Sequence, residues 1–196
     1  MRHADSPTYP TQLTLVHYPD PVLRRTSAPV TAFDDDLRQF TDRMFAAMDE
    51  LRGVGLAAPQ VGVSKRIFVT DHAKKQAEGM SDRRVWINPR IEHAEGVTTY
   101  EEGCLSFPAI YARVERHDRF DIVWQDVLGF EQRLHLDVSA GDFLGIVVQH
   151  ELDHLDGKVF VDLLTPAQLS LIKRRLRDLE KDYKQATGKS GAPLRR

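Results

Sequence analysis

Apolar residues recur at helical spacing in three parts of the chain. In residues 34–53 they lie three or four positions apart, after three consecutive aspartates and before a glycine. This pattern predicts an amphipathic helix, because positions three and four apart share a helix face and acidic residues stabilise the first turn. Thr165-Pro166 is a favourable cap and first turn for another amphipathic helix that reaches Tyr183. Residues 140–155 are apolar on more than one side, which predicts a helix buried in the core.

Short runs of β-branched and aromatic residues fill the middle of the chain. They predict strands at 66–70, 85–88, 120–124 and 131–136, with a polar loop at 71–83. We therefore expect an α+β fold in which short antiparallel strands pack around the buried helix and the other helices lie outside.

The two ends of the chain differ in composition from this core. Five prolines before residue 30 predict an extended arm, residues 1–12 foremost, that wraps the body of the protein. Gly, Pro and Arg in residues 187–196 predict a disordered tail. A chain of 196 residues is long enough for one hydrophobic core, so we expect a single domain spanning residues 1–196.

Composition excludes several classes of partner. Lys and Arg total 27 against 29 Asp and Glu, a net charge of −2, so nothing drives the whole molecule towards DNA or anionic lipid. No apolar run approaches the roughly 18 residues of a membrane span. The first residues lack the apolar core of a signal peptide, and the single cysteine, Cys104, excludes an internal disulfide. We therefore expect a cytoplasmic protein.

The strongest chemical signal is the sequence of residues 149–154, Gln-His-Glu-Leu-Asp-His. Helical residues four apart are separated by about 400°, so His150 and His154 face the same way and can bind one metal ion. Glu151 lies beside the first ligand, where it can accept a proton from water. The alternative is a chance pairing of two helical histidines. A glutamate at the second position of an otherwise apolar helix argues against it.

A hydrolytic metal site needs three protein ligands and one open position for water. The third histidine that metzincin proteases carry six residues beyond His154 is Phe160 here. A distant helical glutamate would serve in other zinc peptidases, and Glu180 is the candidate, although its neighbours suggest a solvated helix face. Cys104 follows Gly103, which lets the backbone approach closely, but a lone cysteine is often only a small buried apolar residue. The residues alone leave both ligand sets open.

Three motifs together resemble a known family. They are GVGLAAPQ at 53–60, EGCLS at 102–106 and QHELDH at 149–154. Their order and spacing resemble the three signature motifs of peptide deformylases, and the resemblance extends from about Leu13 to the C-terminal helix. It implies a metal-dependent amide hydrolase that removes the N-formyl group from the initiator methionine of nascent proteins and releases formate. The implied partners are N-formylmethionyl nascent polypeptides.

The resemblance also implies a metal site. The ligands would be Cys104, His150 and His154, with water as the nucleophile in the fourth position. One Fe²⁺ per chain would be the native metal, and Zn²⁺, Ni²⁺ or Co²⁺ would be able to substitute. A thiolate and two imidazoles suit Fe²⁺ and Zn²⁺ alike, so the residues do not choose between them. Glu102 would support a ligand, and a buried arginine that the sequence does not identify would suit it as a partner.

The same resemblance assigns the catalytic and substrate-binding residues. Glu151 would be the general base and then the general acid. The side chain of Gln60 and the backbone N–H of Leu105 would stabilise the developing oxyanion. The remaining implied residues bind substrate: Gly55 through its backbone, and Val54, Tyr100, Phe143 and Val147 around the methionine side chain.

Two features bear on partners rather than on chemistry. Residues 173–196 carry nine Lys or Arg against three acidic residues, a net charge of +6. A solvated helix is one interpretation, and contact with ribosomal RNA, which the resemblance implies, is the other.

Tyr111 stands where some bacterial members have an arginine, which affects only contacts with the outer residues of the substrate. A ribosome-binding protein with a vestigial metal site is the rival hypothesis, and intact Gln60, Cys104 and Glu151 argue against it.

Overall fold

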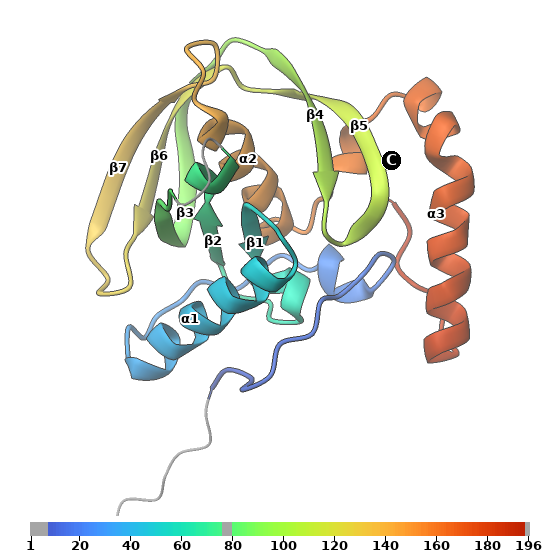
Figure 1. The fold of residues 1–196 in the computed structure, drawn as a ribbon, viewed down its shortest axis with the longest axis horizontal. Helices are drawn as coiled ribbons and strands as arrows, with labels where there is room; N and C mark the ends of the chain where they lie inside the picture. The colour runs from blue at the N-terminus through green and yellow to red at the C-terminus, as the bar shows by residue number, and fades with distance from the viewer. Residues whose placement is uncertain (1–7, 76–79, 195–196) are drawn as a thin grey trace, which may run out of the picture.

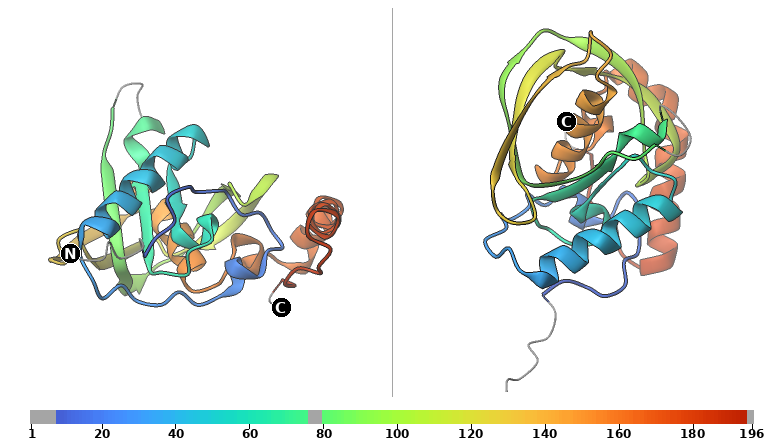
Figure 2. Two further views of the ribbon diagram at one scale, coloured as in Figure 1. Left: turned by 90° about the horizontal axis from the view of Figure 1, so that it is seen from below. Right: turned by 60° about the vertical axis from the view of Figure 1, so that its left-hand side comes forward.

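Five antiparallel strands form a curved sheet that wraps around one helix (Figures 1 and 2). The computed structural model describes residues 8–75 and 80–194 of the chain. In spatial order the strands are β1 (Gly55–Ala57), β2 (Ile67–Asp71), β3 (Arg83–Glu95), β6 (Arg119–Gln125) and β7 (Glu131–Asp137). The enclosed helix is α2 (Phe143–Leu155), and α1 (Asp35–Glu50) covers the other face of β1 and β2. The α+β fold expected from the sequence is confirmed.

Strand β2 is buried along its whole length because a helix lies on each of its faces. Ile67 and Val69 pack into the hydrophobic cluster against α1, whereas Phe68 packs into the cluster against α2. Successive side chains of a strand point to opposite faces, so both sides of β2 need apolar residues. This explains why Ile67, Phe68 and Val69 are apolar in succession rather than alternating with polar residues.

The strands expected from such runs are confirmed. Residues 85–88, 120–124 and 131–136 lie in β3, β6 and β7, and the strand expected at 66–70 is β2, which begins one residue later, at Ile67. The loop expected at 71–83 is shorter than predicted, because η3 (His72–Lys75) follows β2 directly. Residues 76–79 of that loop lie outside the described residues.

The three helices expected from the sequence are also confirmed, with shifted boundaries. Helix α1 is capped by Asp34, whose carboxylate accepts the Leu37 N–H at 2.9 Å. Helix α2 begins at Phe143 rather than at residue 140. The three preceding residues belong to a turn in which the Asp142 carboxylate accepts the Asp137 N–H at 2.9 Å.

A two-stranded hairpin that the sequence patterns did not reveal stands beside the main sheet. It pairs β4 (Thr98–Cys104) with β5 (Phe107–Arg116). Exposed and buried positions mix along both strands, so neither strand has a continuous apolar run. Phe107, Ile110 and Val114 anchor the hairpin in a third hydrophobic cluster with η4 (Phe160–Leu163) and α3 (Pro166–Thr187).

The N-terminal arm follows the surface without helix or strand until η1 (Pro21–Arg24). Its described part is held by defined contacts: the Tyr9 N–H donates to the Asp36 carboxylate at 3.2 Å, and the Val16 N–H donates to the Gln60 carbonyl at 2.8 Å. Residues 1–7 of the predicted arm lie outside the described residues.

The C-terminal segment departs from the expected disordered tail. Thr187 still belongs to α3, and Gly188 ends that helix in the left-handed conformation. The Ala192 N–H then donates to the Pro19 carbonyl at 2.8 Å, and Leu194 packs against the third cluster. Residues 188–194 therefore lie along the arm, and 195–196 fall outside the described range. Across residues 8–75 and 80–194, no helix is both long and apolar enough to span a bilayer.

Candidate metal centre

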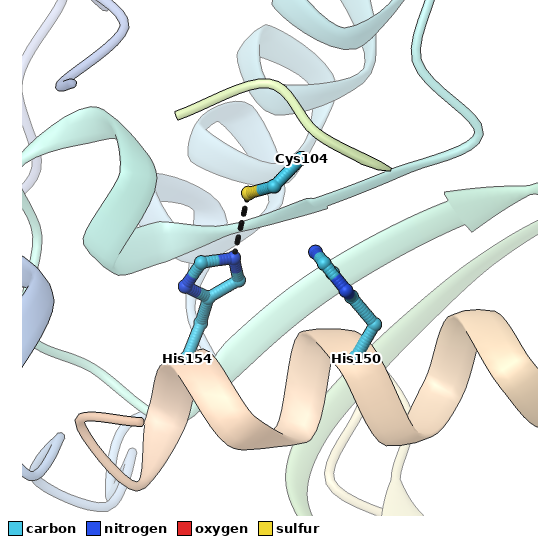
Figure 3. A group of neighbouring side chains, drawn as sticks. All are labelled: Cys104, His150 and His154. Atoms are coloured by element: carbon cyan, nitrogen blue, oxygen red, sulfur yellow. Dashed lines mark hydrogen bonds between the residues drawn. The ribbon is translucent and has the colours of Figure 1, made fainter. Parts of the chain in front are cut away.

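Three side chains with metal-binding atoms meet between α2 and the end of β4 (Figure 3). One ligand atom each of Cys104, His150 and His154 lies within 4.8 Å of the other two. The Cys104 sulfur is 3.3 Å from Nε2 of His154. Both histidines are buried, with 9% and 1% of their surface exposed. The two histidines therefore lie on one face of α2, as their helical spacing predicted, and the hairpin adds Cys104 as the third donor.

The orientation of His150 is fixed by Glu102. Nδ1 of His150 is 2.8 Å from the Glu102 carboxylate, which leaves Nε2 for a metal ion. Glu102 also accepts two hydrogen bonds from Arg116, at 2.6 and 2.9 Å, and Arg116 in turn donates to Asp153 at 2.6 Å. Arg116 is thus the buried arginine that the sequence could not identify.

This ion pair decides the charge of Glu102. Burial alone would raise the pKa of the carboxyl group, but the hydrogen bonds from Arg116 and His150 outweigh it and lower the pKa to about 2. Glu102 is therefore ionised at neutral pH and accepts the Nδ1 proton of His150. In the hairpin, Arg116 pairs with Thr98, which lies on the same strand face as Glu102, so a long side chain can reach along that face. The register places Ala112 opposite Glu102, so strand pairing alone would not have identified Arg116 from the sequence.

Glu151 lies in a different environment from Glu102. It is 4% exposed, and within the described part of the chain its Oε2 atom has no hydrogen-bond partner. Burial raises its pKa to about 7, and a cation bound nearby would lower that pKa. A Cβ atom at Gly55 would lie 2.5 Å from Oε1 of Glu151, so only glycine leaves room for this carboxylate beside β1.

Gln60 lies on η2 (Ala58–Val61), directly after β1. It is 1% exposed, and its Oε1 accepts the Ala57 N–H at 2.8 Å. Its Nε2 is 3.3 Å from the Ser106 hydroxyl and 3.5 Å from the Cys104 sulfur. The structure thus brings Gln60 next to the donor cluster. Ser106 belongs to the EGCLS motif at 102–106, but no sequence pattern indicated its contact with Gln60.

A cavity of about 850 Å³ opens above these groups. Tyr100 and Phe143 form one part of its wall, with ring centroids 5.5 Å apart. All predicted substrate-binding residues line the cavity: Val54, Gly55, Tyr100, Phe143 and Val147. Leu105 and two of the three metal-ligand candidates, Cys104 and His150, line it as well. Tyr111, 65% exposed, stands at the same cavity with its ring over Gly103, where a Cβ atom would lie 2.5 Å from the ring.

The donors fit a transition-metal ion. One thiol and two imidazoles provide three ligands, and the adjoining cavity leaves a further position open to a water molecule or a substrate. Soft sulfur and imidazole nitrogen suit zinc or iron, whereas magnesium and calcium prefer oxygen ligands. The alternative third ligand, Glu180, is excluded: it lies on α3 and accepts the Tyr18 hydroxyl at 2.7 Å. Glu180 is exposed, as expected for a solvated helix face, although its carboxylate also contacts the arm through Tyr18.

Comparisons with known proteins agree on one family. A family model described as polypeptide deformylase matches residues 12–169. The peptide deformylase of Chromobacterium violaceum is 44% identical over 169 residues, which cover 86% of this chain and 96% of that protein. Peptide deformylase 1B, chloroplastic, of Oryza sativa subsp. japonica is 42% identical over 90% of this chain, which spans 64% of the rice protein.

Solved structures give the same result. A crystal structure of a plant peptide deformylase has a TM-score of 0.87 and 36% identity, covering 96% of this chain and 99% of the plant chain. A peptide deformylase from Plasmodium falciparum has a TM-score of 0.82 and 37% identity, covering 90% of this chain and all of that one.

Replacing Arg116 with methionine should lower the free energy of unfolding by about 3–5 kcal/mol, because it leaves the buried charge of Glu102 without its main partner. Arg90→Met is the matched control: Arg90 also pairs with glutamates, but its side chain is 51% exposed, so the loss should be much smaller. Urea unfolding of the two variants measures the difference. Equal losses would show that the buried ion pair contributes no more to stability than the exposed one.

Replacing Cys104 with alanine should abolish or greatly weaken metal binding, because it removes one of three ligands. His135→Ala is the control, since the His135 side chain is 64% exposed and lies outside the cluster. Elemental analysis of the purified variants, followed by metal titration, tests this. Stoichiometric metal bound to Cys104→Ala at unchanged affinity would contradict the assignment of the ligands.

Proposed function

The chain belongs to the polypeptide deformylase family, and from this premise we propose that it removes the N-formyl group from the initiator methionine of nascent polypeptides. The observation that carries the proposal is the position of Glu151 and Gln60 beside the donors Cys104, His150 and His154, at the base of a partly apolar cavity. Such a site can hold a short acyl amide with an apolar side chain next to a hydrolytic centre.

In this proposal Cys104, His150 and His154 hold one Fe²⁺ ion per chain, and Zn²⁺, Ni²⁺ or Co²⁺ can take its place. Members of the family are metal-dependent. The bound metal supplies a Lewis acid that activates a water molecule for attack on the formyl carbon. The ionised Glu102 accepts a hydrogen bond from Nδ1 of His150 and so directs Nε2 of that ring at the ion.

Glu151 moves the proton. Its buried carboxylate, next to His150 in the sequence, takes a proton from the attacking water as the C–O bond forms. It then gives that proton to the amine nitrogen of methionine as the C–N bond breaks, and formate leaves. The Oε2 atom, which has no partner among the described side chains and backbone groups, is the atom available for this transfer.

Gln60 and Leu105 stabilise the negative charge that develops on the formyl oxygen. Because Oε1 of Gln60 is held by the Ala57 N–H, its amide nitrogen is directed towards the metal-ligand side before substrate arrives. The backbone N–H of Leu105, next to Cys104, is the second donor. Donors that are fixed in advance pay little reorganisation cost in the transition state.

The substrate binds through its backbone at Gly55 and through its methionine side chain in the cavity. Val54, Tyr100, Phe143 and Val147 provide the apolar wall. Gly55 is suited to the backbone contact because any side chain there would collide with Glu151. The cavity, about 850 Å³ in all, also has room for the residues that follow methionine.

Contact with the ribosome is a further part of the proposal. Helix α3 buries Ile172 and Leu176 against the third cluster, and most of its basic residues are exposed. Such a surface suits phosphate contacts, which weaken as salt rises. The relatives' names include bacterial and chloroplastic proteins, so the cytoplasmic location stays a prediction.

Formate release from formyl-Met-Ala-Ser tests the function and the metal together. Metal-stripped protein reloaded with Fe²⁺ under anaerobic conditions should hydrolyse this peptide, with kcat/KM at least about tenfold above that of the zinc-loaded protein, or about 1.4 kcal/mol. The physical reason is that iron changes its coordination number more readily as formate binds and leaves. Equal kcat/KM values for the iron-loaded and zinc-loaded protein would contradict the proposed preference for iron. If no metal supported formate release, the proposed function would be overturned.

Glu151→Gln should retain the metal but lower turnover by roughly 10²–10⁴-fold, because the amide keeps the shape of the side chain and cannot take up a proton. Glu115→Gln is the control, since Glu115 is exposed on β5 outside the cavity. Turnover is measured per bound metal ion in both variants. A near-normal rate in Glu151→Gln would assign the proton transfer to another group.

A further inference from the structure

The carboxamide of Gln60 is held at both of its ends. Oε1 accepts the Ala57 N–H at 2.8 Å, and this contact requires the oxygen, not the nitrogen, on that side. Nε2 consequently lies on the other side, 3.3 Å from the Ser106 hydroxyl and 3.5 Å from the Cys104 sulfur. An amide nitrogen has two N–H groups. If one N–H donates to Ser106, the other N–H points towards the side of the amide on which Cys104 lies.

Ser106 is itself firmly held. It is fully buried, and its carbonyl accepts the Tyr18 N–H at 3.0 Å. The next residue, Phe107, is also fully buried, and its ring stacks on Tyr18 at 5.0 Å and meets Phe160 edge-on at 5.5 Å. The backbone that carries the Ser106 hydroxyl is therefore held in place by the arm and by the third hydrophobic cluster.

We propose that Ser106 is a positioning residue that sets the direction of the Gln60 amide through its hydroxyl group. The proposal rests on the role given above to Gln60 as an oxyanion donor. Without the hydroxyl, the contact with Ala57 alone holds the amide, so the amide plane can tilt about that hydrogen bond and its free N–H points at the oxyanion for only part of the time. Losing an oxyanion donor altogether costs about 10²–10³-fold in kcat, and misdirecting one should cost less.

Kinetics of single and double variants test this in the metal-loaded enzyme. Ser106→Ala should lower kcat about tenfold and leave KM within about twofold, because the oxyanion forms only in the transition state. Ser27→Ala is the matched control: Ser27 is 4% exposed, and its hydroxyl has no hydrogen-bond partner among the described residues, so kcat should not change. Equal losses of kcat in both variants, or a change in KM alone, would overturn the proposal.

The double variant shows whether Ser106 acts through Gln60. In a Gln60→Ala background, Ser106→Ala should cause no further loss of kcat, since the group that it positions is gone. Two losses that multiply would mean that Ser106 acts by another route, and the proposal would fail.

A second readout does not depend on activity. In ¹⁵N-labelled, zinc-loaded protein, the side-chain amide signals of Gln60 are assigned by their disappearance in Gln60→Ala. They should shift in Ser106→Ala and stay in place in Ser27→Ala. Unshifted signals in Ser106→Ala would refute the contact. If the wild type released no formate while these signals shifted as expected, the proposed function would fail and the positioning of Gln60 by Ser106 would stand.

Discussion

The whole site depends on how one buried charge is compensated. Glu102 is 5% exposed, and a carboxylate taken out of water without partners would cost several kcal/mol. Its partners come from two other elements: Arg116 from β5 and His150 from α2. Docking the hairpin against the central helix therefore satisfies the charge and, by the same movement, brings Cys104 to the two histidines.

Two buried glutamates in this site have opposite properties because their surroundings differ. Arg116 and His150 donate to Glu102 and lower its pKa to about 2, whereas burial without a partner on Oε2 raises the pKa of Glu151 to about 7. Pairs of carboxyl groups whose environments push their pKa values apart commonly divide structural and proton-transfer roles. The same division is consistent with the proposed chemistry: one carboxylate stays ionised and orients a ligand, and the other exchanges a proton.

The site also requires two strands to pass very close to the side chains that line the cavity. Gly55 lets β1 run against the Glu151 carboxylate, and Gly103 lets the Tyr111 ring lie flat on β4 beside the cavity. A side chain at either position would displace a residue that lines the cavity. The curved sheet wraps around α2 (Figure 2), and both histidines of that helix are buried while the cavity beside them stays open.

The sequence by itself determined the elements whose signals are local. Helical spacing gave α1 and α3, the apolar runs gave four strands, and the four-residue step from His150 to His154 put both rings on one helix face. Only the tertiary structure decided which distant residues meet. Cys104 lies 50 residues from His154 and yet 3.3 Å from its ring, Arg116 was one of many arginines, and Glu180 contacts Tyr18 rather than the metal site. Periodicity fixes the face on which a side chain lies, but hairpin register and helix docking, which depend on packing of the whole chain, fix what stands opposite.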